Sequence, residues 1–317
     1  MNPVAGLWSR LRKGGTRFVA WLPDSVDRRV RVAAWASLII QVILVGTGGA
    51  VRLTGSGLGC PTWPYCTSDS FTTTPEMGIH GIIEFTNRAL TGVVVIIAIV
   101  AFVLVLRIRV QRRELFVLTL LQGLSIPLQA VVGGITVLTG LNSWVVGLHF
   151  VISLLLVVDT AILVYRVYNG TRGGISLASL WLRALTYVAA VLAAVTVVFG
   201  IITTGSGPHA GDARTPRNGF DPVVLEHVHS WPAYALVVVT IAIVVGTFVT
   251  GSAHTFRFAL GLVFVEAVQV VVGLTQARIG LPPALVVTHM VLAASLVAVM
   301  TTTVLSLRAP AAPALRI

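Results

Sequence analysis

The sequence predicts an all-α integral membrane protein with eight transmembrane helices arranged as two pseudo-symmetric four-helix bundles. Its 317 residues are 56% hydrophobic and only 10% charged, a composition too apolar for a soluble domain. Eight apolar runs are each long enough to cross a bilayer, and motifs of the first four runs recur in the last four. Membrane-spanning helices account for this much apolar sequence in so many long runs.

The predicted helices coincide with apolar runs of about 20 residues, the length that a helix needs to cross the hydrocarbon layer. They cover 33–51, 82–106, 115–138, 144–165, 180–203, 224–248, 256–277 and 284–307. Because the number of crossings is even, both termini are expected on the same side of the membrane.

The basic residues indicate which side faces the cytoplasm. Most of them precede the first run, follow the second, flank the loop between the fourth and fifth, or follow the last, whereas the opposite side has Arg52, Arg214, Arg217 and Arg278. Basic residues concentrate on the cytoplasmic side, so we expect a multi-pass protein of the cell membrane with both termini cytoplasmic. The formal net charge of +11 then reflects topology and not nucleic-acid binding. Residues 1–30 lack the long apolar core of a signal peptide and are interpreted as a retained tail.

Motifs of the first half recur in the second. The run from Gln129 to Leu141, followed by His149, aligns without a gap with the run from Gln269 to Leu281, followed by His289, at a constant offset of 140. Halves with equal helix number and the same orientation imply a pseudo-two-fold axis along the membrane normal. We therefore predict a cytoplasmic basic tail (1–32), an N-terminal bundle (33–165), a cytoplasmic linker (166–183), a C-terminal bundle (184–307) and a cytoplasmic tail (308–317).

A carboxylate precedes an imidazole by three residues where the sixth run begins, at Glu226 and His229. On a helix this spacing places both groups on one face. The second run begins with nearly the same pattern, with Glu84 followed by Asn87 in the place of the histidine. Ionisable groups inside a membrane are costly unless they face a partner, a cavity or a cofactor, so these residues are functional candidates.

His149 and His289 lie inside their own runs at a depth similar to that of His229 and Asn87. All four are a few residues from the predicted outer helix end, roughly 6–10 Å deep at a rise of about 1.5 Å per residue. Two neutral imidazoles from different helices at one depth, as at His229 and His289, are typical axial ligands of an electron-carrying heme b. The alternative is a pair of buried histidines bonded to backbone or hydroxyl groups. Zinc is less favoured, because no third ligand is clearly placed nearby.

The first half offers Glu84, Asn87, Arg88 and His149, with His80 one helical turn earlier on the same stripe. Asparagine is a poor ligand for heme iron, so this half cannot repeat the bis-histidine clamp unless His80 substitutes. A porphyrin held by His149 alone would leave an iron face or a ring edge available for chemistry. Glu84 could accept a proton or stabilise a developing positive charge beside a substrate. The alternative is a Glu84–Arg88 ion pair that only ties the structure together.

Three further acids lie in the predicted helices. Glu226 has Ser230 where Glu84 has Arg88, and we interpret Glu226 as part of the cofactor surroundings. Asp159 and Glu266 have no assigned role, and proton conduction stays open for both.

Both cysteines, Cys60 and Cys66, fall in the predicted first outer loop together with Trp63. That compartment is oxidising, so we expect a disulfide that makes a lid rigid, with a redox-active pair as the alternative. The corresponding loop of the second half is shorter and has no cysteine. The extra material therefore covers the first half.

Several of these motifs together resemble the heme A synthases, a family of cytochrome oxidase assembly enzymes. The resemblance covers nearly all of 33–307 and is carried by the run from Val51 to Cys66, the helix start Ile83–Arg88, the segment Val132–Leu138 leading to His149, the loop Gly205–Asp212, and His229 and His289.

The resemblance implies an enzyme that converts the C8 methyl of heme O to a formyl group by successive hydroxylations, giving heme A. It implies a heme b between His229 and His289, and a substrate heme in the N-terminal half beside Glu84 and His149. It also implies that Cys60 and Cys66 match the cysteine pair of the family. We expect heme O and membrane lipid as partners, and leave open heme O synthase, cytochrome oxidase assembly factors, a homo-oligomer and the electron acceptor.

The sequence departs from the family at Asn87, where the resemblance leads one to expect a second N-terminal histidine. Three interpretations follow: a five-coordinate substrate heme, recruitment of His80, or reduced activity, and we favour the first. Two rival functions are a di-heme b-type cytochrome that only relays electrons, against which Asn87 counts, and a transporter, which parallel repeats also suit. Bound heme would distinguish these last two.

Overall fold

The computed structural model describes residues 17, 19–176, 178–211 and 215–310. Much of the two predicted cytoplasmic tails, namely 1–16, 18 and 311–317, lies outside the described residues, as does Arg214 of the expected outer arginines.

Eight long helices dominate the described chain. They are α2 (Arg28–Leu53), α3 (Gly78–Val105), α4 (Arg113–Leu138), α5 (Ser143–Asn169), α6 (Leu180–Ser206), α7 (Pro222–Val249), α8 (Ala253–Arg278) and α9 (Pro283–Ser306), with a short 3-10 turn, η1 (Pro75–Met77), before α3. All eight are long and apolar enough to cross a membrane. The predicted class, an all-helical multi-pass membrane protein, is confirmed.

Polar caps explain why several helices begin before their apolar runs. Asp27 accepts a hydrogen bond from the N–H of Val30 at 3.1 Å, and Asp221 accepts one from Val223 at 2.8 Å. Such side chains satisfy N–H groups that have no partner within the first helical turn. Burial acts to raise the pKa of Asp27, but its hydrogen bonds from Arg29 and Val30 outweigh burial and lower the pKa. The helix starts are therefore set by cap chemistry and not by hydrophobicity.

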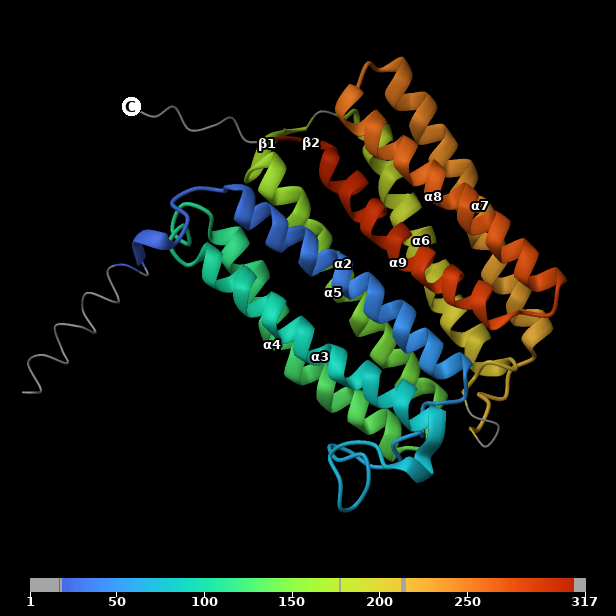
Figure 1. Ribbon diagram of the computed structural model, residues 1–317. Helices are drawn as coiled ribbons and strands as arrows, with labels where there is room; N and C mark the ends of the chain where they lie inside the picture. The colour runs from blue at the N-terminus through green and yellow to red at the C-terminus, as the bar shows by residue number, and fades with distance from the viewer. Residues whose placement is uncertain (1–16, 18, 177, 212–214, 311–317) are drawn as a thin grey trace, which may run out of the picture.

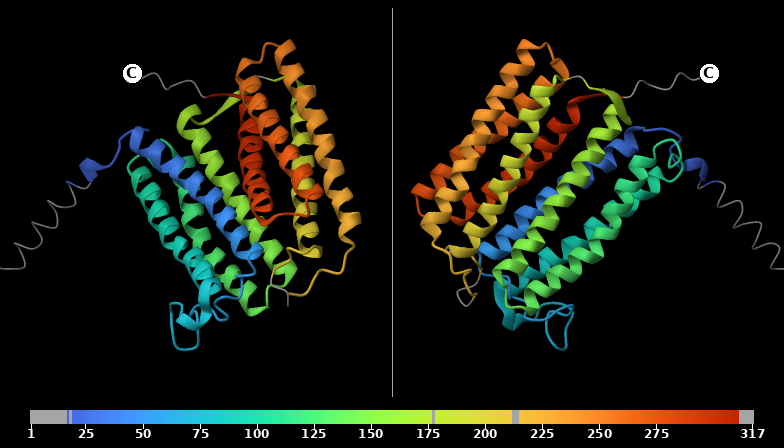
Figure 2. Two further views of the ribbon diagram at one scale, coloured as in Figure 1. Left: turned by 45° about the vertical axis from the view of Figure 1, so that its right-hand side comes forward. Right: turned by 180° about the vertical axis from the view of Figure 1, so that it is seen from behind.

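The helices form two closed groups of four. In the first group α2 and α4 each contact both α3 and α5, and in the second α6 and α8 each contact both α7 and α9. Figures 1 and 2 show the two groups side by side. The loop 54–77 lies at one end, here named the disulfide end, and both ends of the described chain lie at the other (Figure 1). The order of contacts is the same in both groups, which is consistent with the predicted two-fold axis; the axis and the domain boundaries stay predictions.

Helix α9 joins the two groups. It packs against α2 and α5, and α5 also contacts α6. A Cβ atom at Gly46 of α2 would lie 2.9 Å from Val291 Cγ2 of α9, and one at Gly49 would lie 2.9 Å from Met290 Sδ. Small residues of this kind let helix backbones approach closely in a membrane, where packing drives helix association. As a result, Ala294 and Ala298 of α9 are part of the core of the first group.

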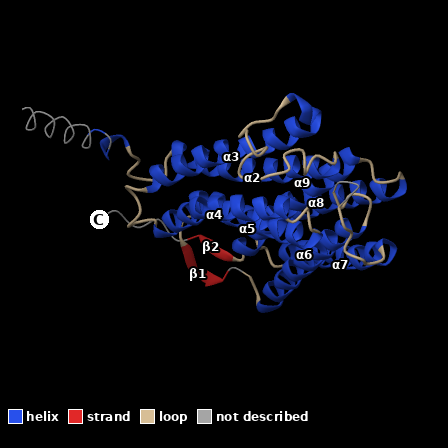
Figure 3. Ribbon diagram, turned by 90° about the horizontal axis from the view of Figure 1, so that it is seen from below, coloured by secondary structure: helices blue, strands red, loops and turns tan. Residues whose placement is uncertain are grey.

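One element was not predicted. Strand β1 (Arg172–Ser176) pairs antiparallel with β2 (Arg308–Pro310), with Arg172 opposite Pro310 and Ser176 opposite Arg308 (Figure 3). It connects the predicted linker between the halves to the segment that follows α9.

The outer surface of the helices is strongly apolar. Ile96, Leu124, Val191 and Phe264 come from four different helices and are each more than 60% exposed. Apolar side chains at this density are unfavourable in water but suit contact with lipid. This surface supports a membrane location independently of helix length.

Candidate functional site

The two histidines predicted to clamp a heme face each other in the C-terminal half. The ring centroids of His229 on α7 and His289 on α9 lie 6.2 Å apart, with an angle of 74° between the ring planes. Two imidazoles bound to one metal ion at about 2 Å each would have their centres roughly 6 Å apart. The observed separation therefore fits axial ligation of a single iron.

A hydrogen bond to the backbone of α6 fixes which ring nitrogen of His229 carries the proton. Its Nδ1 lies 2.9 Å from the carbonyl oxygen of Thr196 on α6, so Nδ1 carries the proton and donates. A histidine bound in this way presents the lone pair of Nε2 to a metal. The close approach depends on Gly200, where a Cβ atom would lie only 2.9 Å from Cε1 of His229.

His289 has a glutamine and a glycine as neighbours on α8. The side-chain nitrogen of Gln269 lies 3.2 Å from His289 Nε2 and 3.2 Å from its carbonyl oxygen. A Cβ atom at Gly273 would lie 3.0 Å from Cε1 of the ring. In the described part of the protein, Nδ1 of His289 is buried without a hydrogen-bond partner. Buried polar atoms are rarely left this way, so the site has unused bonding capacity.

The first half repeats part of this arrangement. His149 on α5 lies over Gly133 of α4, where a Cβ atom would be 3.3 Å from Cε1. Gly133 and Gly273 are separated by the repeat offset of 140, so each half places its histidine over the same glycine. Nδ1 of His149 and Oδ1 of Asn87 are both buried without a partner among the described residues.

Glu84 is buried and fully engaged. It is 5% exposed, its Oε2 accepts the backbone N–H of Cys60 at 2.7 Å, and its Oε1 accepts from Arg88 Nε at 3.1 Å. Arg88 also donates to the carbonyl oxygens of Cys60 and Thr62, both at 3.0 Å. The carboxylate and its ion-pair partner therefore attach the cysteine loop to α3. This contact agrees with the ion-pair interpretation and leaves a further chemical role of Glu84 open.

The cysteine loop forms a lid on the first half. Cys60 and Cys66 are disulfide-bonded with their Cα atoms 4.4 Å apart, and both are fully buried. The ring of Trp63 packs directly on Gly134, next to the glycine beneath His149. In the second half the residue at the repeat position of Gly134 is Leu274, whose side chain would fill the space that the indole needs. A lid of this kind fits only the first half.

The family of the protein follows from its similarity to known proteins. The model of the cytochrome oxidase assembly protein family matches residues 31–301. The chain belongs to this family.

Similar curated members of the cytochrome oxidase assembly protein family are heme A synthases. That of Bacillus pumilus is 36% identical over 138 residues, which is 43% of this chain and 44% of the relative. That of Exiguobacterium sibiricum is 30% identical over 132 residues, 41% of this chain and 43% of the relative. The alignments thus span less than half the length of these relatives.

Two further predicted site residues, and the two acids without an assigned role, have surroundings of their own. His80 is exposed at the start of α3, and its Nδ1 lies 2.9 Å from the hydroxyl of Ser56. Glu226 is exposed on α7. Glu266 is 3% exposed, and its Oε1 accepts the hydroxyl of Thr240 at 2.9 Å. Asp159 Oδ2 is buried without a partner in the described chain.

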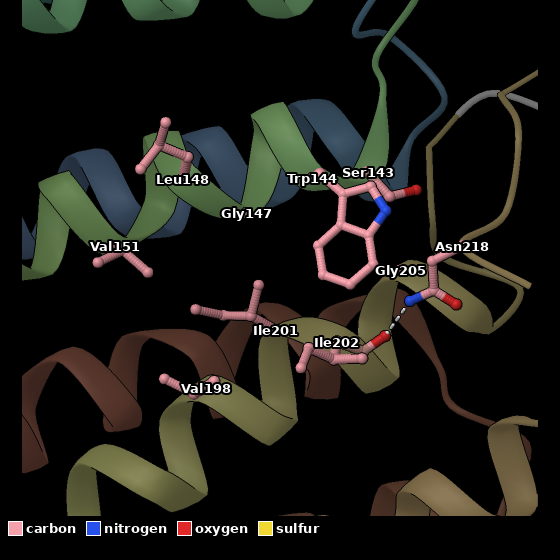
Figure 4. A pocket seen from close by; sticks show the side chains of 10 residues that line it. All are labelled: Ser143, Trp144, Gly147, Leu148, Val151, Val198, Ile201, Ile202, Gly205 and Asn218. Atoms are coloured by element: carbon pink, nitrogen blue, oxygen red, sulfur yellow. Dashed lines mark hydrogen bonds between the residues drawn. The ribbon is translucent and has the colours of Figure 1, made fainter. Parts of the chain in front are cut away.

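A cavity of about 180 Å³ lies between α5 and α6 near the disulfide end. Its walls are mainly aliphatic, with Ser143, Trp144 and Asn218 at one side (Figure 4). Asn218 donates to the carbonyl oxygen of Ile202 at 2.7 Å. No residue predicted for the heme sites lines this cavity.

Several residues of the sites were not identified from sequence. Gly133, Gly273 and Gln269 lie within the recurring motif, so the repeat could have indicated them. Gly200 and Thr196 lie outside it. The sequence Thr-Gly-Ser-Gly occurs at both 54–57 and 204–207, and at this offset of 150 the position that matches Gly200 is Ala50. These two residues become apparent only from the packing of α6 against α7.

Proposed function

We propose that the protein is a heme A synthase, which oxidises the C8 methyl of heme O to a formyl group by successive hydroxylations for cytochrome oxidase. The observation that carries the proposal is the pair of facing imidazoles, His229 and His289, with ring centroids 6.2 Å apart. A related imidazole-on-glycine site in the other half supports a second porphyrin. Membership of the cytochrome oxidase assembly protein family and the names of its relatives support the reaction.

In this proposal His229 and His289 hold heme b as a resident cofactor. Heme b supplies a one-electron carrier when bound. Thr196 fixes the proton of His229 on Nδ1, so Nε2 would be the atom that coordinates the iron. Glu226, which is exposed one turn before His229 on the same helix, would form part of the surroundings of the cofactor. Two histidines without an open position favour electron transfer over chemistry at this centre.

The N-terminal half would take heme O as substrate, with His149 as its iron ligand. Asn87 stands where the other half has His229, so the substrate iron is five-coordinate in this proposal. Arg88 and His80 complete the surroundings at the disulfide end. Oxidation of the methyl group removes electrons together with protons; heme b would take up the electrons one at a time, and Glu84, which is buried in this half, would accept a proton.

A heme also brings two carboxylates, and Arg52 can accommodate one of them. This residue lies in the last turn of α2 at the disulfide end, and its Nε and Nη2 atoms are buried with no partner in the described chain. A buried guanidinium without an anion is unfavourable. A propionate at this position would satisfy it, which adds to the fit between this chain and a porphyrin.

We further propose that the protein lies in the cell membrane with both termini cytoplasmic, so that the disulfide end faces outward. Residues 33–165 would then form the substrate-heme bundle and 184–307 the heme b bundle. Heme O synthase and cytochrome oxidase assembly factors are the candidate partners for such a role.

Identification of the bound hemes tests the proposal. The full chain is purified in detergent from cells supplied with heme O, and extracted hemes are identified by chromatography and mass spectrometry. Heme B together with heme A or hydroxylated heme O is expected. Two molecules of heme B per chain would favour the electron-relay cytochrome, and absence of heme would refute the proposal.

The same assay applied to Glu84→Ala tests the proposed catalytic group. Heme A and its hydroxylated precursor should disappear while heme B is retained, because Glu84 lies in the N-terminal half. Asp69→Ala is the matched control, since it removes an exposed carboxylate of the loop that Glu84 bonds, and this carboxylate accepts a hydrogen bond from neighbouring Ser68. A normal heme A yield in Glu84→Ala would exclude the assignment.

A further inference from the structure

The two halves carry the same glutamine but use it differently. Gln129 and Gln269 each precede their site histidine by 20 residues and are 140 positions apart. Gln269 reaches both Nε2 and the carbonyl oxygen of His289, at 3.2 Å each. Gln129 donates its amide N–H to the hydroxyl of Ser153 at 2.7 Å instead.

The difference is explained by one position on the facing helix. Ser153 lies one turn after His149, and its hydroxyl donates to the His149 carbonyl oxygen at 2.9 Å while accepting from Gln129. The repeat position in the second half is Ala293, which has no hydroxyl. The hydroxyl of Ser153 therefore bonds the amide N–H of Gln129, whereas the amide N–H of Gln269 is directed to the histidine.

We propose that Gln269 is a positioning residue for His289, and that Ser153 withholds the same support from His149 so that the heme of the first half can exchange. This inference rests on the proposed function, because it needs a resident heme in one half and a substrate heme in the other.

Hydrogen-bonding capacity at the ring supports this role. When Nε2 of His289 binds iron, Nδ1 carries the proton and needs an acceptor. Nδ1 of His289 and Oε1 of Gln269 are both buried without a partner in the described chain, and they belong to touching residues. Iron at Nε2 would displace the amide N–H of Gln269 from that atom, and in this proposal Oε1 of the same amide then accepts from Nδ1. In the first half Nδ1 of His149 and Oε1 of Gln129 are also buried without a partner in the described chain, but there the amide is held by its 2.7 Å bond to Ser153, which a rotation would break.

Partners that orient a metal-bound histidine typically change metal affinity about 10- to 100-fold. Gln269→Leu should therefore increase the rate of heme b loss by about that factor, measured as heme transfer to excess apomyoglobin. Gln129→Leu is the matched control and should leave heme b loss unchanged. The low-spin electron paramagnetic resonance signal of heme b should also shift in Gln269→Leu, which a loss of packing far from the iron would not cause.

A swap of the serine separates positioning from folding. Ala293→Ser keeps Gln269 and adds only a hydroxyl, and it should also accelerate heme b loss by diverting the amide. In the Gln269→Leu background the added serine should have no further effect, because its target is gone. Conversely, Ser153→Ala should slow the release of heme from the first half.

The outcomes distinguish the two proposals. If the wild-type protein contains no heme, the proposed function fails. If it contains heme b but Gln269→Leu loses it within twofold of the wild-type rate, the positioning role is refuted. Equal acceleration by Ala293→Ser with and without Gln269 would likewise overturn it.

Discussion

Replacement of Gly200 by alanine should weaken heme b binding through a displacement that can be worked out from the structure. The added Cβ atom would lie 2.9 Å from Cε1 and 3.1 Å from Nδ1 of His229. Ordinary contacts between such atoms are about 3.5–4.0 Å, so the ring must retreat by about 0.5 Å. Thr196 lies one turn away on the same helix, and the retreat therefore stretches the 2.9 Å bond between Nδ1 and its carbonyl oxygen.

The loss of this hydrogen bond determines how much heme b affinity should fall in Gly200→Ala. Good N–H···O bonds extend to about 3.2 Å, so a shift of about 0.5 Å removes this one. A buried donor left without its acceptor costs about 1–3 kcal/mol, and each 1.4 kcal/mol is about a factor of ten in affinity. We expect a drop in heme b affinity of roughly tenfold or more, measured by heme titration of the purified variant and by the low-spin resonance signal.

The chain provides graded controls for this prediction. Gly273→Ala places a Cβ atom 3.0 Å from His289 and should have a similar effect. Gly48→Ala, on α2, has nothing within 4 Å and should leave heme b unchanged. Helix stability does not explain a loss, because alanine is favoured over glycine inside a helix by about 0.5–1 kcal/mol. Heme affinity in Gly200→Ala equal to that in Gly48→Ala would refute the reasoning.

Two further predictions concern the first half. Asn87→His should convert the substrate heme from five-coordinate to bis-histidine ligation, which the absorption spectrum would show as a change from high spin to low spin. The variant should also form heme A more slowly, because the new histidine blocks one face of the iron. An unchanged spin state would mean that this face is not open in the wild type. Replacing both Cys60 and Cys66 by serine should lower the thermal unfolding midpoint by several degrees, because closing a loop this short contributes about 2 kcal/mol. That double variant should also reduce heme A yield while keeping heme b, since Glu84 and Arg88 bond to the loop backbone; equal loss of both hemes would place the effect in global folding.

The helices were predictable because a membrane imposes long apolar runs, and each of the eight was found. Their ends were not, because Asp27 and Asp221 extend helices through local hydrogen bonds that hydrophobicity does not report. The β1–β2 pair was missed for a different reason. Its strands are separated by most of the second half, and neither has an alternating pattern that would predict pairing.

The position of a site residue on its own helix could be predicted from the sequence, but its contacts with other elements could not, and the roles of these residues stay predictions. The facing of His229 and His289 followed from matched depth in two helices. The spacing of Glu84 and Arg88 indicated an ion pair, but not that four of its hydrogen bonds reach the backbone of an irregular loop. His80 shares the stripe of Glu84, yet it lies one turn nearer the disulfide end, where Ser56 bonds it.

The differences between the halves all favour tighter heme binding in the second half than in the first. Both keep the glutamine, the glycine and the histidine of the repeat, which are the parts that bring an imidazole to the same depth. The second half adds His229, which makes a second axial ligand available, and Ala293, which leaves Gln269 for His289. The first half has Asn87, Ser153 and a glycine that admits Trp63, so in the proposed function it offers fewer iron ligands and has a cover that the second half lacks. A chain that must retain one porphyrin and release another needs this division, so the divergence of the repeat is itself an argument for one resident and one exchangeable heme.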